Sequence, residues 1–146
     1  MKKGRLLILG ASGHGKVVGD CARAAGLWPE LVFFDDRWPD LNTCGPWPVS
    51  GTGESLMSQA RQGDHAFVAI GHAETRLKLL QRMASAGLEI ATVIHPSAVV
   101  SDGAVLEAGC LVAAGAVVNI GTRLGPGCIV NTGATVDHDC ILDAGV

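Results

Sequence analysis

The C-terminal third of the sequence repeats with a strict period of six residues. Cut from Ile94 onward, it reads IHPSAV, VSDGAV, LEAGCL, VAAGAV, VNIGTR, LGPGCI, VNTGAT, VDHDCI and LDAGV. The first position of every row is aliphatic, the fifth is small or β-branched, and the fourth is glycine in seven of the nine rows. One aliphatic and one small inward side chain per row, with a glycine near each corner, predict a parallel β-helix in which three rows close one triangular coil.

The repeat also explains the cysteines and predicts a surface. Cys110, Cys128 and Cys140 occupy the small inward position, and five cysteines without a CxxC pair make a poor disulfide framework and a poor metal site. We therefore expect no bound metal. The mostly apolar sixth position is expected to face outward as a stripe that fits an oligomer interface. The last row stops at Val146 without a polar cap, so we expect a shortened chain.

Residues before the repeat alternate between strand and helix patterns. We expect strands at 5–10, 31–36, 65–71 and 90–94, helices at 16–26, 53–63 and 73–87, and an irregular loop at 37–51. This alternation predicts a small parallel sheet with helices on both faces, and such sheets bind ligands beyond the carboxyl ends of their strands. The predicted organisation is an α/β Rossmann-like domain over residues 1–92 and a β-helix domain over 93–146.

The stretch GASGHGKV at residues 10–17 follows the first predicted strand and has almost the pattern of a phosphate-binding P-loop. Gly10, Gly15 and Lys16 have the right spacing, but Val17 replaces the hydroxyl residue that holds magnesium. The dinucleotide fingerprint G-x-G-x-x-G is absent as well. We interpret the stretch as a glycine turn that lets the backbone approach a ligand's phosphates or sugar, with His14 facing the ligand. A plain strand-to-helix turn with a solvated His14 is the alternative.

One row of the repeat has a charged residue at the glycine position. In VDHDCI the glycine position holds Asp139, and His138 precedes it. Departures from a strict local pattern tend to mark functional sites, and a histidine with an adjacent carboxylate is a candidate general base near neutral pH. Taken alone, the same triplet equally fits an exposed His–Asp pair in a turn.

Charge and hydropathy limit the classes of partner. The net charge is −3 and no basic run occurs, which argues against nucleic acid as the main partner. No apolar run is long enough for a signal peptide core or a membrane span, so we expect a cytoplasmic protein without a membrane partner.

Five short motifs, in order along the chain, resemble those of the bacterial sugar acyltransferases related to PglD and NeuD. They are LGASGHGKVV, FFDD, AIG followed by Arg76, IHPSAVVS and NTGATVDHDC. The resemblance covers nearly all of the chain, which is similar to the N-terminal two thirds of such a protein. It implies a left-handed β-helix, a homotrimer, acetyl-CoA as acyl donor, and N-acetylation of a nucleotide-linked 4-amino-4,6-dideoxy sugar. O-acetylation of a sialic acid or another sugar is the alternative within the family.

The resemblance also implies roles for individual residues. His138 is implied as the catalytic base, and Asp139 as the acid that orients or tunes it. The N-terminal domain is implied to hold the nucleotide-sugar, through Gly13, His14, Asp35, Asp36, Arg37 and Gly71. Arg37 stands where some relatives have lysine. Two other classes stay open: a nucleotide-sugar-binding module without catalysis, which the missing C-terminal coils favour, and a P-loop nucleotidase, which Val17 and the β-helix disfavour.

Overall fold

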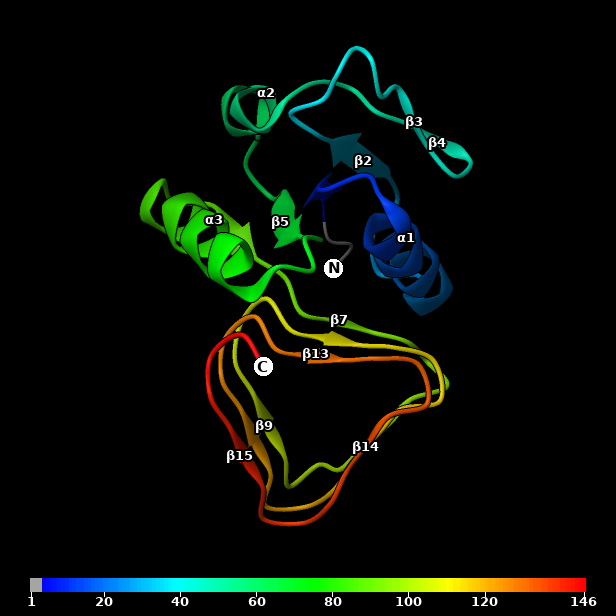
Figure 1. The fold of residues 1–146 in the computed structure, drawn as a ribbon, viewed down its shortest axis with the longest axis vertical. Coiled ribbons are helices and arrows are strands. Elements are labelled where there is room, and N and C mark those ends of the chain that lie inside the picture. Colours follow the sequence, from blue (N-terminus) through cyan, green and yellow to red (C-terminus); the bar gives the residue numbers. More distant parts are fainter. Residues whose placement is uncertain (1–3) are drawn as a thin grey trace.

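A computed structural model describes residues 4–146, so the first three residues of the predicted domain 1–92 lie outside the description. An α/β unit is stacked on one side of a triangular β-helix (Figure 1). The α/β unit contains a four-stranded sheet made of β1 (Leu6–Leu9), β2 (Leu31–Phe34), β5 (His65–Val68) and β6 (Glu89–Ile90). The strands are all parallel and lie in the order β2-β1-β5-β6. No helix within residues 4–146 is long and apolar enough to cross a bilayer.

Both faces of this sheet are covered, and its strands β1 and β2 carry apolar side chains at every position. Leu6 and Ile8 point towards α1 (Gly13–Ala25) and belong to a core that also contains residues of the β-helix. Leu7 and Leu9 point the other way, towards α2 (Gly53–Gln59) and α3 (Ala73–Ser85). The prediction of a parallel sheet with helices on both faces is confirmed, and the continuous apolar run of β1 is what such a doubly covered strand requires.

Two predicted segments differ from the structure. The loop expected at 37–51 contains a short antiparallel hairpin made of β3 (Thr43–Cys44) and β4 (Trp47–Pro48). Each strand has only two residues, which is too short for an alternating pattern to show in the sequence. The single strand expected at 90–94 is two strands. Residues Glu89–Ile90 form the edge of the α/β sheet, whereas β7 (Val93–Ile94) begins the β-helix. Two residues therefore join the two units. The division into a domain over residues 1–92 and a domain over residues 93–146 stays a prediction.

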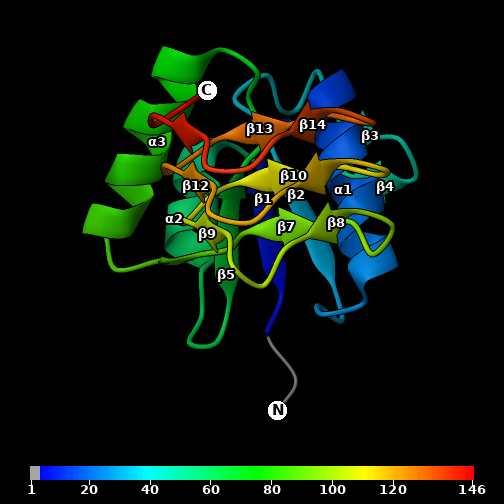
Figure 2. The ribbon, with the colours of Figure 1, turned by 90° about the horizontal axis from the view of Figure 1, so that it is seen from below.

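The β-helix consists of two-residue strands separated by four-residue corners. Its strands stack into three parallel sheets, and Figure 2 shows the strands of one of them, β7, β10 and β13, one above another. They are β7, β10 (Leu111–Val112) and β13 (Ile129–Val130); β8 (Val99–Val100), β11 (Val117–Val118) and β14 (Thr135–Val136); and β9 (Val105–Leu106), β12 (Arg123–Leu124) and β15 (Ile141–Leu142). Paired residues are 18 positions apart, as with Val112 and Val130, so three rows make one coil, as predicted.

The interior of the prism follows the repeat. Cys110, Val112, Ala116, Val118 and Cys128 are all buried in one core, and the five cysteines of the chain are all unpaired. Buried residues concentrate in the middle coil because it has a coil on each side. The predicted fold class, a Rossmann-like α/β unit followed by a left-handed parallel β-helix, is confirmed.

The outward sixth position of the repeat does not form one uniform exposed stripe. On the sheet that faces the α/β unit, Leu111 is fully buried and Ile129 packs against the core that contains α1. On the other two sheets, Val99, Val105 and Ile141 are 63%, 49% and 77% exposed. The expected apolar stripe is therefore wrong on one of the three faces, where the chain covers its own apolar surface.

A buried arginine ties the α/β unit to the β-helix. Arg76 in α3 is 2% exposed, and its Nε and Nη2 donate to the carbonyl oxygens of Gly127 and Gly145, each at 2.7 Å. Its Nη1 donates to the carbonyl oxygens of Ile70 and Gly71, each at 2.9 Å. Burial lowers the pKa of this guanidinium from its ordinary value. One side chain thus satisfies carbonyl groups from the end of β5 and from two corners of the β-helix.

We expect Arg76→Met to destabilise the protein by about 3 kcal/mol or more, because four buried or half-buried carbonyl groups lose their donor while the matched apolar chain keeps the packing. Arg82→Met is the control, because Arg82 is an exposed arginine of the same helix and its replacement should change stability by about 0.5 kcal/mol at most. Urea unfolding of the three proteins measures both. A loss below about 1 kcal/mol for Arg76→Met would contradict the assigned role.

Candidate active site

Two adjoining pockets open beyond the carboxyl ends of the α/β strands. The first, here called the turn pocket, has a volume of about 310 Å³. Segments following β1, β2 and β5 line it: Leu9, Gly10, Ser12, His14, Asp35, Asp36, Arg37, Ala69, Ile70, Gly71 and Leu79. Between β1 and β5 the chain changes the direction in which it adds strands, and this reversal is the usual ligand position in open α/β sheets.

The glycine turn brings the start of α1 close above the end of β1. Gly10 has φ +115°, and a Cβ atom there would collide with the carbonyl oxygen of Ala69. A Cβ atom on Gly15 would collide with the carbonyl oxygen of Gly10. Ser12 precedes α1, and its side chain forms no capping hydrogen bond, so the first N–H groups of the helix are left to a ligand or solvent.

Lys16 does not take the position that a P-loop lysine would need. It lines a shallow groove on the outer side of α1, together with Arg23, Gly45 and Trp47, and it does not line the turn pocket. With Val17 in place of a hydroxyl residue, this position disfavours the P-loop nucleotidase.

Asp35 and Arg37 form one hydrogen-bonded unit at the wall of the turn pocket. Arg37 Nε and Nη2 donate to the two carboxylate oxygens of Asp35, each at 2.9 Å, and the Ala11 N–H donates to Asp35 Oδ2 at 3.0 Å. The Arg37 hydrogen bond is the main reason that the pKa of Asp35 falls to about 2. Arg37 Nη2 also donates to the Ser12 hydroxyl at 2.6 Å. Asp35 thus holds the glycine turn and aims Arg37, whose side chain is 58% exposed.

The remaining predicted residues of this region occupy different positions. His14 lines the turn pocket, and its Nε2 is buried without a hydrogen-bond partner among the described residues. Burial, with the charge of Arg76 as a second cause, lowers the pKa of His14, so the ring is neutral at neutral pH. Gly71 lines the pocket, and a side chain added there would meet open space. Gly13 begins α1 but does not line either pocket.

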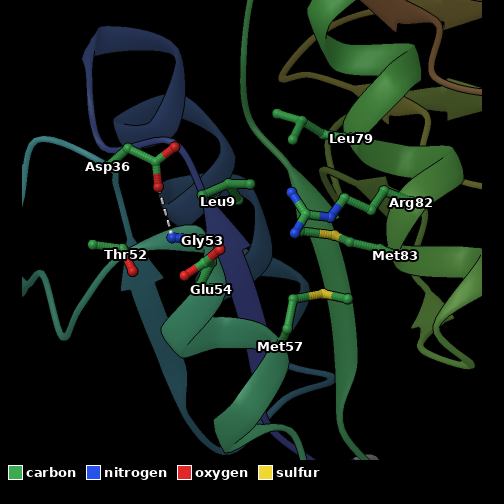
Figure 3. A pocket seen from close by; sticks show the side chains of 9 residues that line it. All are labelled: Leu9, Asp36, Thr52, Gly53, Glu54, Met57, Leu79, Arg82 and Met83. Atoms are coloured by element: carbon green, nitrogen blue, oxygen red, sulfur yellow. Dashed lines mark hydrogen bonds between the residues drawn. The ribbon is translucent and has the colours of Figure 1, made fainter.

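The second pocket, here called the helix pocket, lies between α2 and α3 and shares Leu9, Asp36 and Leu79 with the turn pocket. Its volume is also about 310 Å³. Asp36 stands at the junction, where its Oδ1 accepts from the Gly53 N–H at 2.8 Å (Figure 3). Four lining residues with polar side chains were not predicted from the sequence: Ser12, Thr52, Glu54 and Arg82. Glu54 and Arg82 look like ordinary exposed helix charges, and no local signal distinguishes them.

His138 and Asp139 lie on the corner between β14 and β15. His138 Nδ1 is 2.8 Å from Asp139 Oδ2, and the two side chains are 69% and 76% exposed. An ionised carboxylate only accepts hydrogen bonds, so Nδ1 carries the proton and Nε2 is left to take one from another molecule. The hydrogen bond with Asp139, followed by the charges of Asp137 and Asp139, raises the pKa of His138. His138 therefore loses its second ring proton, and becomes able to accept one, at a higher pH than an ordinary histidine.

The backbone at Asp139 adopts a conformation that the other corners reserve for glycine. Its φ is +56°, the only positive value for a non-glycine residue within 4–146. Gly121, one coil below, has φ +77°, and a Cβ atom there would collide with the Asp139 carboxylate. An aspartate in this conformation costs free energy relative to glycine. Strained positions cluster at functional sites. The strain at Asp139 therefore favours a functional site at this corner over an exposed His–Asp pair without a function.

The predicted residues fall into two separate groups within one chain. The first group, apart from Gly13, lines the turn pocket. The second group lies on the β14–β15 corner, which is the part of the prism farthest from the α/β unit (Figure 1). A single chain therefore does not bring His138 to the pocket.

Comparison with known proteins identifies the chain's relatives. The family model described as PglD N-terminal domain matches residues 5–83, more than half of the chain. The chain belongs to the PglD-like family of sugar acyltransferases.

Solved structures of PglD-like proteins resemble the whole chain. The acetyltransferase domain of PglB from Neisseria gonorrhoeae FA1090, in complex with acetyl coenzyme A, is 42% identical with a TM-score of 0.92 over 99% of this chain and 69% of that one. A perosamine N-acetyltransferase from Caulobacter crescentus, with one histidine replaced by asparagine and in complex with CoA and GDP-perosamine, is 38% identical with a TM-score of 0.88. That match covers 97% of this chain and 67% of that one.

A curated PglD-like relative has a longer chain. UDP-N-acetylbacillosamine N-acetyltransferase from Bacillus subtilis (strain 168) is 33% identical over 101 residues, which are 68% of this chain. The match spans 46% of the length of that relative.

We expect Asp139→Gly to raise the free energy of unfolding by about 1 kcal/mol, because glycine adopts a φ of +56° without the cost that a side chain brings. The exposed pair that is lost contributes little to stability. Asp102→Gly is the matched control, since Asp102 lies in the corner between β8 and β9, two coils below, and lacks a positive φ. Thermal unfolding of both variants measures the difference. A less stable Asp139→Gly protein would show that the conformation carries no cost.

Proposed function

We propose that this chain is the nucleotide-binding and acyl-transfer part of an acetyl-CoA-dependent N-acetyltransferase, and that its acceptor is a nucleotide-linked 4-amino-4,6-dideoxy sugar. The observation that carries the proposal is the corner at His138. There the repeat gives up its glycine, the backbone takes a strained conformation, and a carboxylate fixes the ring so that Nε2 is free. The relatives bound to acetyl coenzyme A, CoA and GDP-perosamine support the substrate classes.

The two pockets have the groups that a nucleoside diphosphate needs. Arg37 and the uncapped start of α1 offer a positive charge and N–H donors to phosphate oxygens in the turn pocket. Asp36 stands at the end of β2, where dinucleotide-binding folds place the acid that accepts the ribose hydroxyls. Gly71 leaves open space in the wall, and neutral His14 adds a ring surface rather than a second positive charge.

The reaction itself requires one proton acceptor. Acetyl-CoA supplies an activated acyl group as its thioester. His138 Nε2 accepts the proton from the sugar amine as the amine nitrogen forms its bond to the thioester carbonyl carbon. His138 then returns this proton to the departing sulfur as the carbon–sulfur bond breaks, so the products are an amide and a thiol. No covalent enzyme intermediate is needed, and burial keeps the Cys110 thiol protonated, with its pKa raised to about 11.

The site is proposed to form between chains of a homotrimer. The corner with His138 and the turn pocket are apart in one chain, and the two β-helix faces with Val99, Val105 and Ile141 exposed provide apolar surface for neighbours. His138 of one chain would then serve a nucleotide-sugar held by the next. Such a trimer working in cytoplasmic glycan synthesis fits the absence of any candidate membrane helix within residues 4–146.

Two alternatives use the same pockets. O-acetylation of a sialic acid or another sugar would need the same base at His138 but a hydroxyl acceptor. A non-catalytic nucleotide-sugar-binding module would use the turn pocket alone. The hydrogen bond that orients the His138 ring and the strained backbone at Asp139 both favour catalysis. A binding module would not need a strained corner outside its pocket.

We expect His138→Ala to lower kcat for acetyl-CoA-dependent release of free CoA by about a hundredfold or more, since the proton acceptor is lost. The variant should fold normally, because the side chain is largely exposed. Asp102→Ala is the control at the same corner two coils away, and it should keep full activity. Equal rates for His138→Ala and the original chain would favour the binding module, and an acceptor with only hydroxyl groups would reveal O-acetylation.

Mixed oligomers should regain activity if the site lies between chains. Gly71→Trp is expected to fill the turn pocket without strain, because nothing lies within 4 Å of a Cβ atom there. After the inactive His138→Ala and Gly71→Trp chains are unfolded and refolded together in equal amounts, about a quarter of the sites should combine two intact halves. The CoA-release assay measures the recovery. A mixture as inactive as its components would place the complete site within one chain.

A further inference from the structure

The helix pocket has apolar walls against which a flat ring could pack. Its apolar walls are Leu9, Met57, Leu79 and Met83, contributed by β1, α2 and α3. Methionine side chains are unbranched and polarisable, and they pack well against aromatic rings. The pocket is continuous with the turn pocket through Asp36, so a molecule bound over the glycine turn can extend into it.

Two charged side chains face this pocket. Glu54 lies in the first turn of α2 and Arg82 in the last turn of α3. Figure 3 shows the Glu54 carboxylate and the Arg82 guanidinium pointing into the space between the helices from opposite sides. Among the side chains drawn there, the hydrogen bond between Gly53 and Asp36 is the single one formed. Within residues 4–146 neither Glu54 nor Arg82 forms an ion pair.

We infer that the helix pocket holds the base of the nucleotide-sugar and that Glu54 and Arg82 select guanine. This inference rests on the proposed function, because it adds the identity of the base to the nucleotide site. The diphosphate would lie over the start of α1, the ribose beside Asp36, and the base between Met57 and Met83. Glu54 and Arg82 are then specificity-determining residues of the acceptor site.

Guanine matches this pair of charges better than the other bases. Its N1–H and N2–H₂ groups are adjacent donors, which one carboxylate accepts together, and its O6 and N7 are acceptors for an arginine fork. Uracil has a single N–H between two carbonyl oxygens, so one oxygen of the Glu54 carboxylate would face a carbonyl and be repelled. Asp36 is less suited to reading a base, because its Oδ1 already accepts from the Gly53 N–H.

Calorimetric titration of the full chain with GDP, IDP and UDP tests the inference atom by atom. IDP lacks the N2 amino group but keeps N1–H, O6 and N7. We expect GDP to bind about tenfold tighter than either IDP or UDP, which is the usual discrimination of a paired base contact. Glu54→Gln should lower the affinity for GDP to the affinity for IDP. Arg82→Gln should instead lower the affinities for GDP and IDP by the same factor of about ten.

Glu74→Gln is the matched control, because Glu74 is an exposed first-turn glutamate of α3 that pairs with Lys78 and lies outside both pockets. It should leave all three affinities unchanged. UDP binding tighter than GDP, or equal losses of GDP and UDP affinity in Glu54→Gln, would overturn the guanine assignment while leaving the nucleotide site intact. Failure of all three nucleotides to bind would overturn the proposed function together with this inference.

Discussion

The arrangement of the molecule depends on one buried guanidinium. Arg76 is enclosed without a carboxylate partner among the described residues, and its charge is distributed over four backbone carbonyl groups. Burying a charge in this way is costly unless every donor is satisfied, which happens only when the end of β5 and two β-helix corners lie in one particular arrangement. The guanidinium therefore selects a single orientation of the α/β unit on the prism, and a shared core of Leu6, Ile8 and Leu111 fills the interface.

The same contact shapes the turn pocket. Ile70 and Gly71 both line the turn pocket, and their carbonyl oxygens both accept hydrogen bonds from Arg76. The residue that joins the two units therefore also holds the pocket wall. The opposite wall is held by Asp35, which binds Arg37 and the Ala11 N–H. The pocket is consequently formed before any ligand arrives, and little ordering is required on binding.

The sequence predicted most of the fold because the pattern is strong where packing is regular. A period of six over nine rows defines the prism, and buried strands such as β1 are apolar at every position. What it missed depends on tertiary context. The run from Ile90 to Ile94 looks like one strand, but the chain crosses from one sheet to another within it. Leu111 was expected to face a second chain, but it faces the chain's own α/β unit.

The functional residues divide in the same way. Asp139 could be found from the sequence because it replaces a glycine in a strict repeat, and the structure shows the physical counterpart in its positive φ. Glu54 and Arg82 could not be found, because exposed charges on helices are common and their facing positions depend on how α2 and α3 pack. Gly13 was assigned to the ligand through its motif, yet it lines neither pocket.

The short connection between β6 and β7 fixes where the β-helix begins relative to the α/β sheet. Ala91 and Thr92 alone separate the two sheets, and Arg76 holds later coils, so the number of coils fixes where each corner lies along the prism axis relative to the α/β unit. Each coil adds about 4.8 Å along the prism axis. An 18-residue insertion or deletion before β14 would keep the six-residue period, but either would move His138 along the prism axis by more than the length of a hydrogen bond. The number of coils between Val93 and His138 therefore determines where His138 lies along the prism axis.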